Sequence, residues 1–302
     1  MRILITGSSG MLGTEFCKVF GEEHELIGID VNKPQEPDFA PPIFHEASIT
    51  YAGRIRAIFD ARNPEVVIHA AAWTDVDGCE EKPDKACLVN TSGTKILGRL
   101  AKSKNIPFIF ISTDFVFDGE KDTPYEEEDP GNPLSVYGKT KWEAEEFIRQ
   151  ELDNYMILRT SWLYGKNGKN FVDTIIGKAR KERHLKVVND QVGGPTYAKD
   201  VAKILKGFVS SFGFSWKDIF HTCNAGKCTW FDFARQILAD LKDLDDVVVE
   251  PITAAELGRP APRPRFSVLD NSKLNKKMGY IMRPWEDALK DYIDNECPSV
   301  TR

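Results

Sequence analysis

The sequence predicts an α/β fold, a doubly wound parallel sheet followed by a smaller C-terminal lobe. Over the first half of the chain, short β-branched and almost wholly apolar runs alternate with helical patterns. Such runs are typical of strands that are buried on both faces of a parallel sheet. Beyond about residue 162 this alternation loosens, and loops rich in glycine and proline appear. A chain of 302 residues is long enough for one large domain with a partner lobe.

The apolar runs place strands at residues 2–6, 25–30, 65–72, 107–113 and 155–162, with a further strand ending near residue 45. Apolar residues at helical spacing follow several of them, as with Leu12, Phe16 and Phe20 after the first strand. The run at 107–113 is followed by a helix over about 142–152. Because strand–helix–strand crossovers are right-handed, these units build a doubly wound sheet.

The remainder of the chain predicts a substrate-binding lobe. Residues 228–241 have the pattern of a helix, residues 189–198 that of a loop, and residues 251–265 are expected to be extended because prolines recur there. We expect a dinucleotide-binding domain over 1–160, completed by part of 180–222, and a lobe formed mostly by 161–302.

Charge and composition exclude several classes of protein. A net charge of −6 disfavours nucleic acid as a partner, because phosphate binding needs a basic surface. No apolar run of about 18 residues occurs, and the N-terminus is a poor signal peptide. The six cysteines lack CxxC or zinc-site spacing, which favours reduced thiols. A cytoplasmic protein without membrane partners is therefore expected.

A nucleotide site is predicted directly after the first strand. The segment "ITGSSGMLG" places Gly7, Gly10 and Gly13 at the mouth of the first helix, where glycines allow a pyrophosphate to approach the helix N-terminus. This is the context of a Rossmann dinucleotide site. The remaining expected cofactor contacts in the turn and at the end of the strand at 65–72 are Ser9, Met11, Leu12, Ala70, Ala71 and Ala72.

The acidic residue that ends the second strand bears on the choice of cofactor. Asp30 can accept hydrogen bonds from the adenosine ribose and repel a 2′-phosphate, which favours NADH. Lys33 follows closely and could tolerate a phosphate, so NADPH remains open. Asp30 could also be only a turn residue.

One tyrosine–lysine pair has the spacing of an acid–base device. Tyr137 and Lys141 stand four residues apart in "SVYGKTKWEAEE", and a nearby ammonium lowers the pKa of a phenol. Ser112 and Thr113 end the fifth strand, where strand ends face the ligand crevice and a hydroxyl can bond a substrate carbonyl. Together these residues predict a carbonyl-reduction site, against the plainer interpretation of a solvated helix face.

At these motifs the chain resembles an extended short-chain dehydrogenase/reductase, and more closely the dTDP-4-dehydrorhamnose reductase family. The broader resemblance rests on "TGSSGMLG", "STD" and "YGKTK". The closer one rests on "AAWTDVDGCE", "STDFVFDG", "RTSWLYG", "NDQVGGPTYA" and "RPRFSVLD", which span nearly the whole chain in the family's order.

The resemblance implies reduction of the C4 ketone of dTDP-4-dehydro-6-deoxy-L-mannose by NAD(P)H. Tyr137 would be the general acid, Lys141 would bind the nicotinamide ribose, and Thr113 would polarise the ketone. Asn90 would help to hold the site near the cofactor, and Trp162 would contact the sugar.

The resemblance also implies substrate-side residues and a metal. Asp75 and Asp77 lie in the family's substrate-side loop, and Arg263 would lie near the nucleotide diphosphate. Glu15 matches a carboxylate with which some relatives hold Mg²⁺ between the subunits of a homodimer, although a solvated helix glutamate is the favoured interpretation. Ser48 stands where relatives often carry an acidic residue near the adenine.

Two other functions stay open at this point. The first is a non-catalytic NADP-binding partner that resembles the β subunit of methionine adenosyltransferase, although an intact Thr113, Tyr137 and Lys141 disfavours it. The second is a nucleotide-sugar epimerase or dehydratase, although dehydratases usually carry "TDE" where this chain has "TDF".

Overall fold

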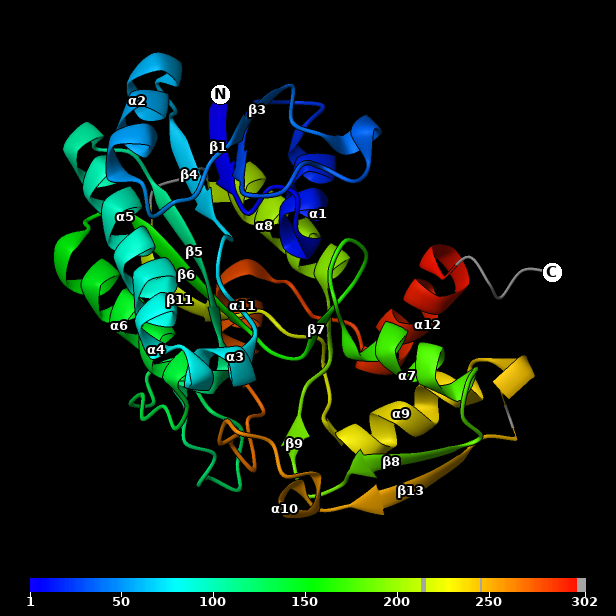
Figure 1. Cartoon of the computed structure of the whole chain (residues 1–302). Helices are drawn as coiled ribbons and strands as arrows, with labels where there is room; N and C mark the ends of the chain where they lie inside the picture. Colours follow the sequence, from blue (N-terminus) through cyan, green and yellow to red (C-terminus); the bar gives the residue numbers. More distant parts are fainter. Residues whose placement is uncertain (213–215, 245, 298–302) are drawn as a thin grey trace.

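The fold is a doubly wound parallel sheet with a smaller lobe at its carboxyl edge, as the sequence predicts (Figure 1). The computed structural model describes residues 1–212, 216–244 and 246–297. The seven strands of the main sheet are ordered β11-β6-β5-β4-β1-β2-β3, and every neighbouring pair is parallel. The sheet strands are β1 (Arg2–Thr6), β2 (Glu25–Asp30), β3 (Ile43–Glu46), β4 (Val66–His69), β5 (Phe108–Thr113), β6 (Tyr155–Thr160) and β11 (Lys217–His221).

Helices cover both faces of this sheet, and each face has its own apolar core. On one face lie α1 (Met11–Phe20), α8 (Ala198–Phe212) and α11 (Ser272–Met278), which pack on residues such as Ile3 and Ile5. On the other lie α2 (Ala52–Arg62), α5 (Gly93–Lys104) and α6 (Val136–Glu151), which pack on the alternate residues, such as Leu4. Successive side chains of a strand point to opposite faces, so one apolar run fills both cores.

The C-terminal lobe has a third core of its own. It forms between α7 (Phe171–Ala179), α9 (Trp230–Ala239) and α12 (Trp285–Glu296), with strands β8 (His184–Val188) and β13 (Val248–Ile252) paired in parallel beside them. Figure 1 shows these elements grouped beyond the carboxyl ends of the main strands. The chain enters the lobe after β6, returns through α8 and β11, and enters it again, so the lobe is joined to the sheet at several points.

Short elements lie between these helices and strands. They are α3 (Val76–Glu81), α4 (Pro83–Ala86), a π-helical turn (Cys87–Ser92), α10 (Ala254–Leu257), the 3-10 turns Pro37–Phe39, Asp114–Val116 and Lys242–Leu244, and the two-residue strands β7 (Leu163–Tyr164), β9 (Val192–Gly193), β10 (Thr196–Tyr197) and β12 (Cys228–Thr229). No helix in the described ranges is both long enough and apolar enough to cross a bilayer.

Three sequence-based boundaries were wrong. Helix α6 begins at Val136, because the Ser135 hydroxyl accepts the Gly138 amide at 3.1 Å and caps it. The stretch 251–265 is not extended throughout, because Thr253 and Glu256 form a capping box that starts α10. The stretch 189–198 contains β9 and β10 rather than a loop alone.

Candidate active site

A cavity of about 1830 Å³ lies between the carboxyl ends of the sheet strands and the C-terminal lobe. Single-ligand pockets usually enclose roughly 300–1,000 Å³. The cavity is therefore large enough for two extended ligands side by side. Its walls include the first glycine turn, the ends of β4 and β5, the start of α6, and residues of α7, β8 and α9.

The glycine turn is shaped by close backbone contacts. Gly7 has a φ of +70°, and a Cβ on Gly13 would lie 2.0 Å from the Gly7 carbonyl oxygen. Neither position accepts a side chain without moving the turn. Gly10 caps the N-terminus of α1 with its backbone, and the predicted residues Ser9, Met11 and Leu12 line the cavity beside it. The turn thus presents backbone amides at a helix N-terminus, where anions bind.

Asp30 lines the cavity and also holds the turn in place. Its Oδ2 accepts the Ser9 amide at 3.0 Å, and its Oδ1 accepts the Asn32 amide at 2.9 Å. The structure therefore gives Asp30 the turn-fixing role that the sequence left as an alternative, in a position that also faces the cavity. Lys33 lines the same part of the cavity.

Three alanines form the floor at the end of β4. Ala70, Ala71 and Ala72 all line the cavity, and the Ala71 amide donates to the Thr6 hydroxyl at 3.3 Å. A Cβ on Gly7 would lie 2.8 Å from the Ala71 nitrogen. A glycine is therefore required at position 7, because the glycine turn and the backbone of this strand end approach so closely.

Tyr137 is buried in the first turn of α6 and reaches the cavity beside Thr113. Its ring meets Phe115 edge-on, with centroids 5.7 Å apart. Gly138 allows this packing, since a Cβ there would lie 2.2 Å from the Phe115 carbonyl oxygen. The glycine next to the phenol is thus needed for the close approach of α6 to the end of β5.

Electrostatics around Tyr137 differ from the sequence-based expectation. Burial raises the pKa of Tyr137 above its ordinary value, a hydrogen bond with Thr113 opposes this in part, and the charge of Asp114 adds to it. The expected lowering of this pKa by Lys141 is therefore wrong for the described structure. Lys141 instead donates from Nζ to the Ile111 carbonyl oxygen at 2.6 Å, and burial lowers its own pKa to about 7.

Ser112 and Asn90 do not point to the reacting centre. The Ser112 hydroxyl donates to Glu145, which forms a fully buried ion pair with Arg159 at 2.7 Å. Asn90 accepts the Trp73 amide at 2.7 Å and donates to the Thr140 hydroxyl at 3.1 Å. Other atoms of Ser112 line the cavity. Asn90 does not line it, and instead links the loop after β4 to α6 from behind the cavity wall.

Trp162 stands in a strained backbone conformation at the cavity wall. Its φ is +44°, which is unusual for a bulky residue. Its ring stacks on Trp230 of α9, with centroids 3.4 Å apart and planes 6° apart. A Cβ on Gly193 would lie 2.3 Å from the Trp162 ring, so Gly193 makes room for it. The indole pair forms a flat aromatic wall at the junction of the two parts.

The predicted acidic and basic substrate residues meet at one end of the cavity. Asp75 caps α3 by accepting the Gly78 amide at 3.1 Å. Asp77 accepts from both Arg259 and Arg263 at 3.0 Å, and these guanidinium groups hold the pKa of its carboxyl below the usual value against the effect of burial. Asp77 and the two arginines therefore link α3 to the segment after α10.

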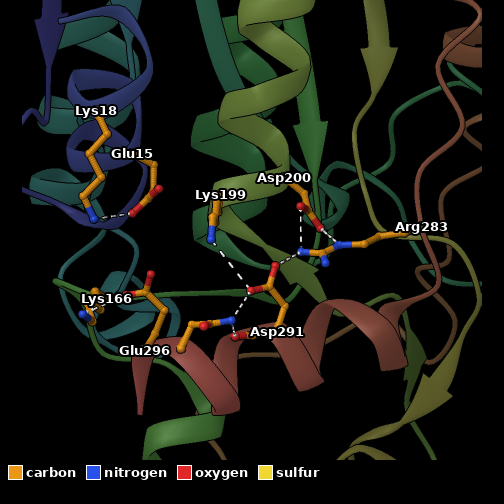
Figure 2. A network of polar contacts seen from close by, with 9 residues as sticks. Glu15, Lys18, Lys166, Lys199, Asp200, Arg283, Asp291 and Glu296 are labelled. Atoms are coloured by element: carbon orange, nitrogen blue, oxygen red, sulfur yellow. Dashed lines mark hydrogen bonds and ion pairs between the residues drawn. The ribbon is translucent and has the colours of Figure 1, made fainter. Parts of the chain in front are cut away.

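Within this one chain, the residues around Glu15 do not form a magnesium site. Figure 2 shows a network in which Lys18 binds Glu15 at 2.9 Å and Lys166 binds Glu296 at 2.8 Å, while Arg283 pairs with Asp200 and Asp291. No group of three acidic, histidine or cysteine residues in the described ranges could hold a metal ion. Glu15 is also buried rather than solvated, so cations of the chain itself neutralise these carboxylates.

Several cavity residues were not singled out as site residues from the sequence. Those that come from the lobe and its connections are Lys85, Phe171, Lys178, Lys186, Gln191, Trp230 and Arg259. They lie on separate elements, and only the packing of the lobe against the sheet brings them together. Asp114 was visible in the sequence, directly after Thr113, but its burial could not be read there.

Comparisons with known proteins agree with this architecture. The family model described as RmlD substrate binding domain matches residues 1–297. The dTDP-4-dehydrorhamnose reductase of Aggregatibacter actinomycetemcomitans is 36% identical, over 96% of this chain and 97% of its own. The crystal structure of a dTDP-4-dehydrorhamnose reductase ortholog from Clostridium acetobutylicum has a TM-score of 0.87 and 42% identity, covering 97% of this chain and 99% of that chain.

A second solved structure contains a bound cofactor. The dTDP-4-dehydrorhamnose reductase of Bacillus anthracis, in complex with NADP, has a TM-score of 0.87 and 30% identity, covering 97% of this chain and 98% of that chain. The fold, the glycine turn and the cavity beside it define the class of nicotinamide-dependent nucleotide-sugar reductases. Within that class, the chain belongs to the dTDP-4-dehydrorhamnose reductase (RmlD) family.

Proposed function

We propose that the protein reduces the C4 ketone of dTDP-4-dehydro-6-deoxy-L-mannose to give dTDP-L-rhamnose. The observation that carries this proposal is the position of the Tyr137 phenol and the Thr113 hydroxyl in one cavity with the glycine turn. The cavity volume suits a dinucleotide and a nucleotide sugar together. Family membership supports the same chemistry.

The glycine turn and the end of β4 would hold the dinucleotide, which supplies a hydride when bound. Tyr137 would give its proton to the developing alkoxide, and Thr113 would hold the oxygen that receives it. Lys141, with its pKa lowered to about 7 by burial, regains positive charge most readily beside anionic groups such as a phenolate. Positioning of both ligands by the cavity walls supplies much of the remaining rate enhancement.

The substrate end of the cavity fits a nucleoside diphosphate. Arg263 and Arg259 offer guanidinium groups that suit phosphate oxygens, with Asp77 as their counter-ion until a phosphate replaces it. Trp162 and Trp230 offer a flat apolar wall for a sugar or a base. Asp75 would act only by fixing the start of α3, because its carboxylate caps that helix.

We propose NADH as the favoured cofactor, with NADPH also accepted. The Asp30 carboxylate lines the cavity beside the glycine turn, where it would bind the adenosine ribose of a dinucleotide and repel a 2′-phosphate. Lys33 lines the same cavity and would offset part of that repulsion. The Bacillus anthracis relative, solved with NADP, is the reason to test both cofactors.

The test is an assay with purified dTDP-4-dehydro-6-deoxysugar in which the absorbance of NADH and of NADPH is followed separately. Loss of one reduced cofactor per sugar reduced is expected. An epimerase or a dehydratase would return its hydride and consume no reduced cofactor. A complex with methionine adenosyltransferase and no turnover would instead favour a regulatory partner. A homodimer and a cytoplasmic location remain predictions.

A further inference from the structure

A buried line of hydrogen bonds joins the end of β1 to the start of α6, and His69 lies near its middle. His69 ends β4, pairs in register with Thr6 of β1, and is 1% exposed. Its Nδ1 lies 2.7 Å from the Thr6 hydroxyl oxygen, and its Nε2 lies 2.9 Å from the Thr94 hydroxyl oxygen of α5. Hydroxyls from two different elements therefore satisfy both nitrogens of the buried ring.

Beyond Thr94 the line continues to Tyr137. The Thr94 hydroxyl donates to the Asn90 carbonyl oxygen at 2.6 Å, and the Asn90 side-chain amide donates to the Thr140 hydroxyl at 3.1 Å. The Thr140 hydroxyl donates in turn to the Tyr137 carbonyl oxygen at 2.8 Å. We call the connecting residues the His69 network: Thr6, His69, Thr94, Asn90 and Thr140. None of them is more than 4% exposed, so water does not compete for these hydrogen bonds.

The number of available protons fixes which nitrogen of His69 is protonated. The single hydroxyl proton of Thr94 goes to the Asn90 carbonyl oxygen, which can only accept, so Thr94 must accept from His69 Nε2. Nε2 therefore carries a hydrogen. Burial holds the pKa of His69 well below its ordinary value, and the charge of Lys141 acts in the same direction. The ring is therefore neutral, and its Nδ1 accepts the hydroxyl proton of Thr6.

The two ends of the His69 network lie at two parts of the site whose separation matters. At one end, the Thr6 hydroxyl oxygen accepts the Ala71 amide at 3.3 Å, where the end of β4 lies against Gly7. At the other end is Tyr137, whose side chain lines the same cavity as Ala71. A hydride and a proton must reach adjacent atoms of one carbonyl group, so an error of about 1 Å in this separation can cost roughly 10²-fold in rate.

We propose that His69 is a positioning residue that, as a fixed Nε2–H tautomer, holds the floor of the dinucleotide site at its working distance from Tyr137. The network passes from β1 through β4 and α5 to α6, four elements that are far apart in the sequence. Each of its donors has one acceptor, so the links cannot re-form with the hydroxyls turned the other way. This inference rests on the proposed function, because it takes Tyr137 as the proton donor and the end of β4 as the floor under the dinucleotide.

The first test is ¹⁵N NMR of the histidine rings in the wild-type protein without ligands, with His69 assigned from its backbone resonances. We expect a proton on Nε2 and none on Nδ1, unchanged between pH 6 and pH 9. A proton on Nδ1, or a ring that titrates in this range, would overturn the inference whatever reaction the protein catalyses.

The second test compares His69→Leu with His221→Leu. His221 is a matched control, because it is a fully buried histidine at the end of β11 whose Nδ1 bonds the Asp270 carbonyl oxygen at 2.9 Å, and it does not line the cavity. We expect His69→Leu to lose roughly a hundredfold in kcat, with the dinucleotide Kd and the sugar KM within about threefold of wild type, because both ligands still bind but are misplaced relative to Tyr137. His221→Leu should lower the unfolding temperature and keep the wild-type kcat.

Cuts on either side of His69 test whether the links act together. Thr6→Val and Thr94→Val each remove one hydroxyl and keep the shape of the side chain, so they also serve if His69→Leu does not fold. Each should lower kcat, and the double variant should be no slower than the slower single variant, because a network that is cut once no longer spans the site. Losses that multiply in the double variant would show two independent local effects and would overturn the inference.

Two further results would also count against the positioning role. They are a wild-type kcat in His69→Leu and an equal loss of kcat in His221→Leu. Tyr137→Phe separates this failure from failure of the proposed function. An inactive Tyr137→Phe protein together with a fully active His69→Leu protein would refute the positioning role alone, whereas an active Tyr137→Phe protein would refute the proposed function.

Discussion

Replacement of Glu145 by glutamine is expected to destabilise the protein strongly. Glu145 and Arg159 are fully buried, and their charges meet at 2.7 Å, with further contacts from Arg159 Nε at 3.1 and 3.2 Å. Glutamine keeps the size of the side chain but leaves the guanidinium without a counter-charge. Breaking a buried pair in this way costs about 3–5 kcal/mol.

That loss is a large part of a total stability of about 5–15 kcal/mol. The Ser112 hydroxyl also donates to Glu145, so the change disturbs the strand that ends at Thr113. We therefore expect a loss of about 4 kcal/mol in the free energy of unfolding, measured by urea denaturation followed by circular dichroism.

A matched control lies on the same helix. Glu151 pairs with Lys102 at 2.9 Å, but about half of each side chain is exposed. Glu151→Gln should change the free energy of unfolding by no more than about 1 kcal/mol. Equal losses for the two variants would refute the argument that burial, rather than the distance between charges, decides the effect.

Three further predictions concern the site. Tyr137→Phe should lower turnover roughly 10²- to 10⁴-fold while fluorescence titration shows unchanged cofactor binding; near-normal turnover would contradict the acid role. Asp30→Ala should weaken NADH more than NADPH in the same titration, and equal losses would argue that Asp30 only holds the turn. Lys141→Met should raise the unfolding temperature near pH 7 more than near pH 9, unlike the exposed control Lys139→Met. The folded protein loses the Lys141 proton at a pKa of about 7, whereas the unfolded chain still holds it, so the wild type gains stability between pH 7 and 10. A difference in unfolding temperature between the wild type and Lys141→Met that is the same at pH 7 and pH 9 would refute this reasoning.

Most of the sheet could be predicted from local sequence. The runs at residues 2–6 and 25–30 match β1 and β2, because a strand buried on both faces must be apolar at successive positions. The glycine turn was equally visible, because Gly7, Gly10 and Gly13 directly follow the first strand in the sequence. The short helix at Ala254–Leu257 was missed because prolines on either side hid a local capping box.

The sequence by itself determined the parallel sheet, the glycine turn and the spacing of Tyr137 and Lys141, because periodicity and chain geometry decide these locally. Only the tertiary structure decided what those groups do. It directs Lys141 to the Ile111 carbonyl, ties Ser112 to a buried ion pair and leaves Asp114 Oδ2 without a hydrogen-bond partner among the described residues. The physical reason is that desolvation and the choice of hydrogen-bond partner depend on elements that are distant in the chain, so the pKa values of the site are set by packing.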